Sequence, residues 1–173
     1  MAYSKHQQIE KKIFRPEQYD SMLRYIKYLR FLEKRIVFTN GCFDLLHAGH
    51  TDYLARAADL GDVLIIGLNT DSSVSRLKGR SRPLNNQEAR ARVLASLAFV
   101  DSVILFEKDT PAELITAVRP DVLVKGGDYS ADEIAGADIV RENGGRVLCI
   151  PLLEGYSTSG IIEKILAERN KKF

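Results

Sequence analysis

The clearest sign of the fold lies in residues 36–50, Ile36-Val-Phe-Thr-Asn-Gly-Cys-Phe-Asp-Leu-Leu-His-Ala-Gly-His50. Its apolar, β-branched beginning, residues 36–39, predicts a strand, which Asn40-Gly41 ends. A helix is expected to follow the turn, because apolar residues recur there at helical spacing. These helical positions are Tyr53, Leu54, Ala57 and Ala58.

The turn between this strand and this helix carries two histidines, His47 and His50, with Gly49 between them. Backbone N–H groups at a helix N-terminus face an anion in α/β proteins, and glycines let the backbone approach it closely. The pattern therefore predicts a phosphate site at this turn.

The composition is that of one soluble globular domain. The 173 residues are 45% hydrophobic and 28% charged, which allows a sizeable core. No apolar run approaches the length of a membrane helix, and residues 1–12 lack the apolar segment of a signal peptide. Two cysteines, Cys42 and Cys149, form no disulfide framework and are interpreted as reduced thiols. We expect a cytoplasmic location and no membrane partner.

The net charge of +2 is unevenly spread. Residues 1–35 hold nine Lys and Arg against four Asp and Glu, whereas the remainder holds sixteen against nineteen. A nucleic-acid-binding protein usually shows a basic face, so we expect no nucleic-acid partner. The basic N-terminal stretch is interpreted as a solvated helix face, with RNA or membrane contact as the alternative.

The chain divides into an N-terminal helical extension, residues 1–35, and a main domain, residues 36–173. Within the extension, residues 17–33 have the spacing of an amphipathic helix, preceded by Pro16. Its apolar positions are Tyr19, Met22, Leu23, Ile26 and Leu29.

Strands and helices alternate through the main domain. Five strands are expected, at residues 36–39, 62–68, 102–106, 121–125 and 146–151. This alternation predicts an α/β fold with a doubly wound, five-stranded parallel sheet of the Rossmann-like kind. One helix is expected at residues 86–98, with Ala89, Val93, Leu94 and Leu97 facing inward, and a last one carries Ile161, Ile162, Ile165 and Leu166.

Polar residues follow four of these strands. They are residues 40–50, 69–71, 125–128 and 154–159. The carboxyl ends of parallel strands meet at one edge of a sheet, where ligands bind at the point of strand-order reversal. We therefore expect these four segments to converge on one site.

Two of these segments resemble a known family. Gly41–His50, ending in His47-x-Gly49-His50, resembles the phosphate-binding signature of the cytidylyltransferase-like nucleotidyltransferase superfamily. Tyr156-Ser-Thr-Ser159 is similar to its second signature, a turn at a helix start. The resemblance covers residues 36–166 and implies that residues 36–173 form a nucleotidyltransferase domain.

Three stretches are similar to a narrower group, the D-glycero-β-D-manno-heptose 1-phosphate adenylyltransferases, which in many bacteria form one half of a bifunctional heptose kinase/adenylyltransferase. They are residues 77–83, 124–129 and 154–159. This resemblance implies that ATP and heptose 1-phosphate give ADP-heptose, used for lipopolysaccharide, and pyrophosphate. It also implies Mg²⁺ held mainly through the phosphates, and a homodimer.

The resemblance also implies roles for individual residues. The catalytic residues would be His47, His50 and Lys78. Nucleotide-binding residues would be Asn40, Gly41, Cys42, Phe43, His47, Gly49, His50, Asn69, Arg90, Lys125, Tyr156, Ser157, Thr158 and Ser159. Substrate contacts would come from Asp44, Lys78, Gly127 and Asp128, and no residue is predicted to ligate a metal.

The chemistry that this reaction requires agrees with these residue types. The nucleophile is a phosphate monoester whose second pKa is near 6, so it is already anionic at neutral pH. Neither a general base nor a covalent intermediate is required. The enzyme must instead align the attacking oxygen and offset the growing negative charge, a task for imidazoles, lysines and backbone N–H groups.

Other interpretations of the same residues stay open. The two histidines are alternatively ordinary helix-start residues, or zinc ligands together with Cys42, or one half of a Cys-His nucleophile pair. Asp44 is alternatively a helix cap, and Arg90 a solvated helix residue. Lys78 and Gly79 are alternatively a helix end, residues 157–159 a helix start, and residues 125–128 a plain turn.

The function has alternatives as well. One is cytidylyl or adenylyl transfer to another sugar or polyol phosphate. Glycerol-phosphate cytidylyltransferases are expected to have arginines where this chain has Ala98 and Leu152, which favours ATP over CTP. The other alternative is a non-enzymatic nucleotide-sensing or RNA-associated module.

Overall fold

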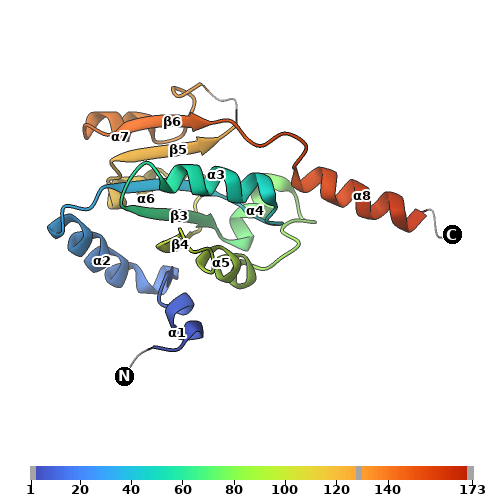
Figure 1. Cartoon of the computed structure of the whole chain (residues 1–173), viewed down its shortest axis with the longest axis horizontal. Helices are drawn as coiled ribbons and strands as arrows, with labels where there is room; N and C mark the ends of the chain where they lie inside the picture. Colours follow the sequence, from blue (N-terminus) through green and yellow to red (C-terminus); the bar gives the residue numbers. More distant parts are fainter. Residues whose placement is uncertain (1–2, 128–129, 171–173) are drawn as a thin grey trace.

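The computed structural model describes residues 3–127 and 130–170, and its centre is a parallel six-stranded sheet (Figure 1). The strands are β1 (Ile13–Phe14), β2 (Ile36–Gly41), β3 (Val63–Asn69), β4 (Ser102–Phe106), β5 (Val122–Gly126) and β6 (Arg146–Ile150). The helices are α1 (Lys5–Glu10), the 3₁₀ helix η1 (Pro16–Gln18), α2 (Tyr19–Phe31), α3 (Ala48–Ala58), α4 (Asp71–Lys78), α5 (Gln87–Ala95), α6 (Ala112–Val118), α7 (Ala137–Glu142) and α8 (Thr158–Asn170).

The α/β fold and its five expected strands are confirmed, and the sixth strand was missed. Strand β1 lies in the stretch that was expected to be helical only. It pairs with β4 through Ile13 opposite Val103 and Phe14 opposite Ile104. Two residues are too few to show the alternation by which a strand is recognised in a sequence.

The order of the strands places the site. Across the sheet the order is β1-β4-β3-β2-β5-β6, so the chain first moves outward from β2 to β4 and then returns to β5 on the other side of β2. The order therefore reverses between β2 and β5, which pair through Val37 opposite Val122 and Phe38 opposite Leu123. Ligands bind beyond the carboxyl ends of strands at such a point.

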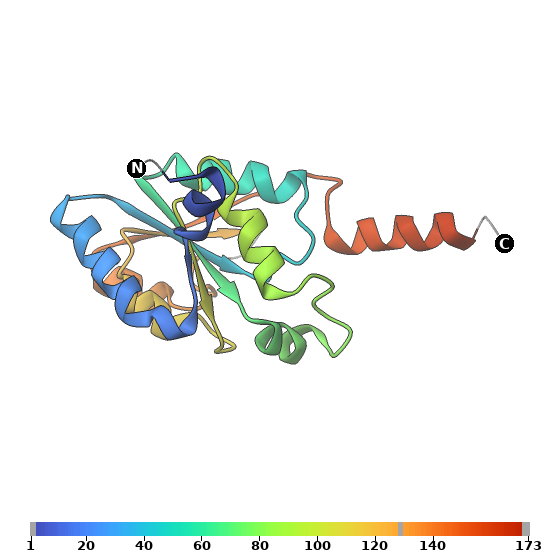
Figure 2. The same cartoon turned by 90° about the horizontal axis from the view of Figure 1, so that it is seen from below.

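Two apolar layers hold the helices against the sheet, one on each face. Helices α3 and α5 cover one face, where Leu54 and Leu94 belong to the same buried cluster as Ile66. Helices α2, α6 and α7 cover the other, where Ile26 and Ile115 belong to the same buried cluster as Ile65 (Figure 2). Every residue of β3 is buried, as expected for a central parallel strand.

The N-terminal extension packs on the sheet and on α5. Helix α2 begins and ends close to its predicted bounds, and it buries Met22, Ile26 and Leu29. Arg15 forms ion pairs with Glu10 and with Glu88 of α5. The basic stretch is thus attached to the rest of the fold through both apolar and charged contacts.

The inward face of α5 differs from the prediction. Ala89 and Val93 face solvent, with Val93 50% exposed, whereas Arg90, Ala91, Leu94 and Ala95 are buried. A pattern of apolar residues places an arginine outward by default. Here the Arg90 guanidinium can be buried because it is hydrogen-bonded, so the buried face of α5 is the one that carries Arg90.

Helix α8 stands away from the sheet and the other helices in both views (Figures 1 and 2). Two of its four predicted apolar positions, Ile165 and Leu166, are 62% and 50% exposed. No helix among the described residues is both long and apolar enough to cross a membrane.

Candidate active site

The two histidines lie side by side at the start of α3. His47 is the residue before the helix, in an extended conformation, and His50 lies in the first turn. Their rings stack with centroids 3.8 Å apart, and the ring of Phe43 meets His50 edge-on at 5.3 Å. Both side chains are half-buried, and neither Nδ1 atom has a hydrogen-bond partner among the residues that the structure describes.

The surroundings keep both imidazoles neutral at pH 7. Burial lowers the pKa of His50 to about 4, with further lowering by His47 and by the Lys78 ammonium. Burial also lowers the pKa of His47. A neutral imidazole has one donor and one acceptor nitrogen, and an anion placed beside it favours the protonated form. The pair is therefore suited to meet a phosphate.

Two lysines reach the same region from different elements. Lys78 ends α4 and is followed by Gly79, whose φ of +94° turns the chain into a basic loop, residues 78–82. Lys125 near the end of β5 is half-buried and donates to the carbonyl oxygen of Asn40 at 3.2 Å. Burial lowers the pKa of Lys125, and the nearby Lys78 adds to the lowering. Two imidazoles and two lysine ammonium groups thus gather where β2 and β5 end.

Asp44 holds the basic loop in place. Its carboxylate is 4% exposed and accepts hydrogen bonds from the backbone N–H groups of Leu84 and Asn85, at 2.8 and 3.0 Å. Arg82 Nε lies 2.8 Å from the same carboxylate as an ion pair. In return, the Asn85 side chain donates to the Asp44 carbonyl oxygen at 3.0 Å. These contacts occupy the group that was predicted to touch the substrate.

Arg90 holds the turn after β2 in place in the same way. Only 2% of the residue is exposed, which overturns its interpretation as a solvated helix residue. The guanidinium donates to the carbonyl oxygen of Cys42 at 2.6 Å, to that of Asn85 at 3.0 Å and to Asp71 Oδ1 at 2.7 Å. Its contact with the nucleotide stays a prediction, and its contact with the turn is structural. We call the contacts of Asp44 and Arg90 the clamp.

Close approach explains the glycines of the motif. A Cβ on Gly49 would lie 3.1 Å from His47 Nδ1 and 3.2 Å from the Cβ of Tyr156. A Cβ on Gly41 would lie 3.1 Å from the ring of Phe43, whose own φ is +43°. Larger residues would displace an imidazole or an aromatic ring, so these glycines set the shape of the site.

The turn before α8 lies against the histidine turn. Tyr156 lies near Gly49, since a Cβ built on that glycine would be 3.2 Å from the Tyr156 Cβ. Thr158 Oγ1 donates to the carbonyl oxygen of Leu45 at 3.5 Å. The Ser157 hydroxyl accepts from the N–H of Gly160 at 3.0 Å, which confirms that this segment starts the helix. Capping and phosphate binding are compatible here, because the other N–H groups of the first turn lack helical partners.

Two further predicted residues make contacts within the fold, and a third is not described. The Asn69 side chain is buried and donates to the Ser73 hydroxyl at 2.9 Å, so it braces the start of α4. Gly127 has a φ of +123° and donates to the carbonyl oxygen of Ile150 at 2.9 Å. Asp128 lies outside the described residues.

The described residues offer no ligand cluster for zinc, and the Nδ1 atoms of the histidines make no pair with Cys42. Within residues 3–127 and 130–170, no three His, Cys, Asp or Glu side chains are grouped closely enough to hold a metal ion. The Nδ1 atoms of the two histidines are bonded to no described residue, and hence not to Cys42.

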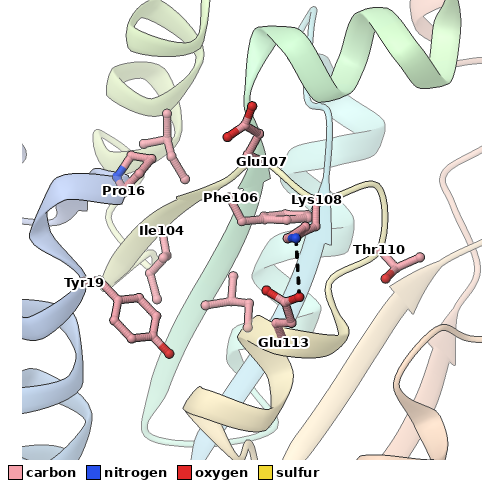
Figure 3. A pocket seen from close by; sticks show the side chains of 10 residues that line it. Pro16, Tyr19, Ile104, Phe106, Glu107, Lys108, Thr110 and Glu113 are labelled. Carbon is pink, nitrogen blue, oxygen red and sulfur yellow. Dashed lines mark ion pairs between the residues drawn. The ribbon is translucent and has the colours of Figure 1, made fainter.

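Two cavities differ in their relation to these residues. One of about 220 Å³ lies between the ends of β2 and β5 and is lined by Asn40 and Lys125. The other, of about 270 Å³, lies at the end of β4 between η1 and α6, and its walls include Tyr19, Phe106 and Leu114 (Figure 3). None of the predicted site residues lines this second, more apolar cavity.

Comparison with known proteins gives three kinds of similarity. A family model described as cytidylyltransferase-like matches residues 38–164. The bifunctional protein HldE of Magnetococcus marinus is 59% identical over 136 residues, which are 79% of this chain and 28% of that protein. The protein of the same name from Syntrophotalea carbinolica is 53% identical over 156 residues, 86% of this chain and 32% of that one. The chain thus spans about a third or less of these relatives.

Two solved structures are similar as well. The lipopolysaccharide core biosynthesis protein of Thermoplasma volcanium is 25% identical with a TM-score of 0.55, covering 72% of this chain and 99% of that one. A pantoate-β-alanine ligase of Francisella tularensis is 15% identical with a TM-score of 0.51, covering 80% and 67%, and shares the fold alone.

Proposed function

The chain belongs to the cytidylyltransferase-like family, and we propose that it is a nucleotidyltransferase that moves AMP from ATP to D-glycero-β-D-manno-heptose 1-phosphate. The products are ADP-heptose and pyrophosphate. One observation carries the proposal: two stacked imidazoles, each with a partnerless Nδ1 within the described chain, lie at the N-terminus of α3 beside the strand-order reversal. The identity to the HldE proteins, whose names describe them as bifunctional, supports the choice of substrate.

The reaction is an in-line displacement at the α-phosphorus of ATP. An oxygen of the acceptor phosphate forms the new P–O bond, and the bond from the α-phosphorus to the bridging oxygen of pyrophosphate breaks. The leaving pyrophosphate carries away the electron pair. The acceptor arrives as an anion, so no residue has to remove a proton from it.

The residues of the chain position the phosphates and offset charge. His47 and His50 donate hydrogen bonds to phosphate oxygens as negative charge grows in the transition state. Lys78 and Lys125 bring positive charge from the basic loop and from β5, and the first turn of α3 offers backbone N–H groups. Holding both reactants in line accounts for much of the rate.

Magnesium enters this proposal with the nucleotide. The clamp occupies the carboxylate of Asp44, and the described residues contain no cluster of ligands that would hold a metal ion unaided. Mg²⁺ commonly binds through substrate phosphates and few protein groups, which fits this donor set. Bound there, it would neutralise part of the phosphate charge.

The base preference rests on Leu152. A Cβ on Gly126 would lie 2.8 Å from Leu152 Cδ2, so Leu152 covers the end of β5 with apolar surface at the site. Ala98 precedes β4 and lies at the opposite, amino edge of the sheet, so it has no bearing on the base. The apolar surface of Leu152 favours adenine, and cytidylyl transfer to another polyol phosphate is the second candidate.

A screen of donors and acceptors tests the function. We expect pyrophosphate release from ATP and heptose 1-phosphate with Mg²⁺, and little release with CTP or with glycerol 3-phosphate. Turnover only with CTP and another acceptor would replace the proposal by the second candidate. Nucleotide binding without turnover for any sugar phosphate would indicate the non-enzymatic module.

We propose further that the chain acts in the cytoplasm as a homodimer. Exposed apolar residues on α8, among them Ile165 and Leu166, form a surface that isolated proteins seldom leave uncovered. Sedimentation equilibrium is expected to give twice the mass of the chain, and a single-chain mass across the micromolar range would refute the dimer.

A further inference from the structure

The strands β2 and β5 separate from each other before they end. Their pairing stops at Phe38 opposite Leu123, although β2 continues to Gly41 and β5 to Gly126. Their outer neighbours stay alongside, because β2 pairs with β3 up to Gly41 and β5 pairs with β6 up to Gly126. The last three residues of each strand therefore border an opening at the point where the strand order reverses.

The side chain of Tyr53 on α3 lies where the two strands separate. The residue is 3% exposed, and its hydroxyl donates to the carbonyl oxygen of Val124 on β5 at 3.2 Å. The same hydroxyl bonds to Oγ1 of Thr39 on β2. A tyrosine hydroxyl has a single proton, so Thr39 is the donor in this second bond. Tyr53 thus joins β2 to β5 just beyond the last pair of the ladder.

The environment of Tyr53 preserves this bridge. Burial raises the pKa of Tyr53, so the hydroxyl keeps the proton that it donates to Val124. A Cβ on Gly126 would lie 3.3 Å from Cδ2 of the Tyr53 ring, so the ring lies against the end of β5 as well. A phenylalanine ring would fill the same space, so packing alone does not account for the hydroxyl.

The bridge bears on the position of the imidazoles. His50 lies three residues before Tyr53 on α3, and residues three apart lie on the same side of a helix. The chain and the clamp already attach the start of α3 to β2, whereas Tyr53 attaches the helix to β5 across the opening. No described residue bonds to Nδ1 of either histidine, so the placement of these nitrogens depends on the helix that carries them.

We propose that Tyr53 is a positioning residue, whose hydroxyl fixes α3 to β5 through the Val124 carbonyl oxygen and so holds His50 in line with the reacting phosphate. The inference rests on the proposed function for the identity of that phosphate. Alignment is sensitive to small displacements, since a shift of ~1 Å lowers a rate by ~10²-fold.

Tyr53→Phe tests the proposal, because it keeps the ring and removes the bond to Val124. We expect kcat to fall by about 10-fold, while the KM values for ATP and heptose 1-phosphate change by less than about threefold. The contacts that bind the two substrates remain, and only their alignment with the imidazole is lost. Steady-state kinetics with separate titrations of both substrates measure this, and urea denaturation shows that the variant is folded.

Thr39→Ala is the matched control. It removes the other partner of the same buried hydroxyl and leaves the bond between Tyr53 and Val124 in place. Both variants lose a buried hydrogen bond, so both should unfold at a lower urea concentration. Only Tyr53→Phe should lose turnover, and kcat of Thr39→Ala should stay within about twofold of that of the unmodified chain. Equal losses of kcat in the two variants would reject the assignment.

Histidine-detected NMR without substrates gives a second measurement. In Tyr53→Phe we expect the signals of His47 and His50 to shift and the pKa of His50 to rise from about 4 toward its ordinary value, because a displaced helix start buries the imidazole less. In Thr39→Ala these signals should stay in place. Unchanged imidazole signals in Tyr53→Phe would reject the assignment.

The two measurements separate this inference from the proposed function. An unmodified chain that does not turn over heptose 1-phosphate would reject the proposed function, and the NMR comparison would still show whether Tyr53 places the imidazoles. An active unmodified chain with unchanged kcat in folded Tyr53→Phe would reject the positioning role alone. A raised KM for ATP with unchanged kcat would reject it as well, by showing that Tyr53 affects binding and not alignment.

Discussion

Two groups of polar side chains meet at the turn after β2, and they differ in what satisfies them. The clamp, formed by Asp44 and Arg90, is buried and bonded throughout to backbone and side chains of the same chain. The stacked imidazoles of His47 and His50 each keep a buried Nδ1 that no described residue contacts. Buried polar groups in proteins are nearly always paired, so these two imidazole nitrogens need a cause.

The difference separates structure from function within one sequence motif. Removing a group whose partners are all protein atoms leaves those partners unsatisfied, which lowers stability. Removing a group that has no protein partner leaves the fold nearly as stable and takes away a contact to the ligand. Substitutions in the clamp should therefore lower the stability of the fold, whereas substitutions of the two histidines should lower turnover.

The largest expected effect is on stability, from Arg90→Met. This change leaves the carbonyl oxygens of Cys42 and Asn85 without their donor, and we expect the free energy of unfolding to fall by about 3–5 kcal/mol. Urea denaturation measures it. Arg92→Met on the same helix removes only an exposed pair with Glu10 and should change stability by less than about 1 kcal/mol. Equal losses in the two variants would remove the distinction.

His50→Asn is expected to lower kcat by about 10²–10³-fold, because one donor to the developing charge is lost. The free energy of unfolding should change by less than about 1 kcal/mol, since no described partner of Nδ1 is left unsatisfied. Initial rates of pyrophosphate release and a denaturation curve give both numbers. A variant that is unfolded, or one that is fully active, would contradict the account.

Asp44→Asn should have a smaller effect. An amide oxygen in place of Oδ1 can still accept from both backbone N–H groups, but the side chain no longer pairs with Arg82, so we expect a loss of about 1–3 kcal/mol in the free energy of unfolding. Asp52→Asn, which weakens an exposed pair with Arg56, is the control. Normal stability together with a strongly raised acceptor KM would instead return Asp44 to the substrate.

The smallest effect is a dependence of stability on pH. The pKa of His50 falls from its ordinary 6.5 to about 4 on folding, chiefly through burial. Between these values the unfolded chain binds more protons, so the free energy of unfolding decreases as the pH falls from 6.5 toward 4. In His50→Asn the decrease between pH 7 and pH 5, measured by denaturation, should be shallower, and an unchanged slope would show that His50 does not titrate this way.

The sequence predicts the fold, and the sheet edge at which the polar segments gather, because both depend on local patterns. Alternating apolar strands and helices predict the parallel sheet, and polar residues after strands predict the edge where His47 and Lys125 gather. The short strand β1 was not predicted, because its two residues form a strand only by pairing with β4. The exposure of the apolar residues on α8 was not predicted either, because apolar spacing indicates a helix but not whether its apolar face is buried.

Roles within the site are harder to predict, since they depend on contacts between distant residues. Arg90 bonds to Cys42 across 48 positions, and Asp44 reaches Leu84 across 40. Nothing in the spacing near either residue indicates such a partner. A charged residue flanked by buried positions, as Arg90 is by Ala91 and Leu94, is the one signal that points to a buried and bonded role.

The two imidazoles are proposed to meet the phosphates of the nucleotide. Histidine-detected NMR titration, with and without a non-hydrolysable ATP analogue and Mg²⁺, tests it most directly, with His6 of α1 as an internal reference. We expect the nucleotide to raise the pKa of His50 from about 4 toward its ordinary value and to shift the signals of His47, while the His6 signals stay in place. Binding of the analogue with no change at His47 and His50 would contradict it.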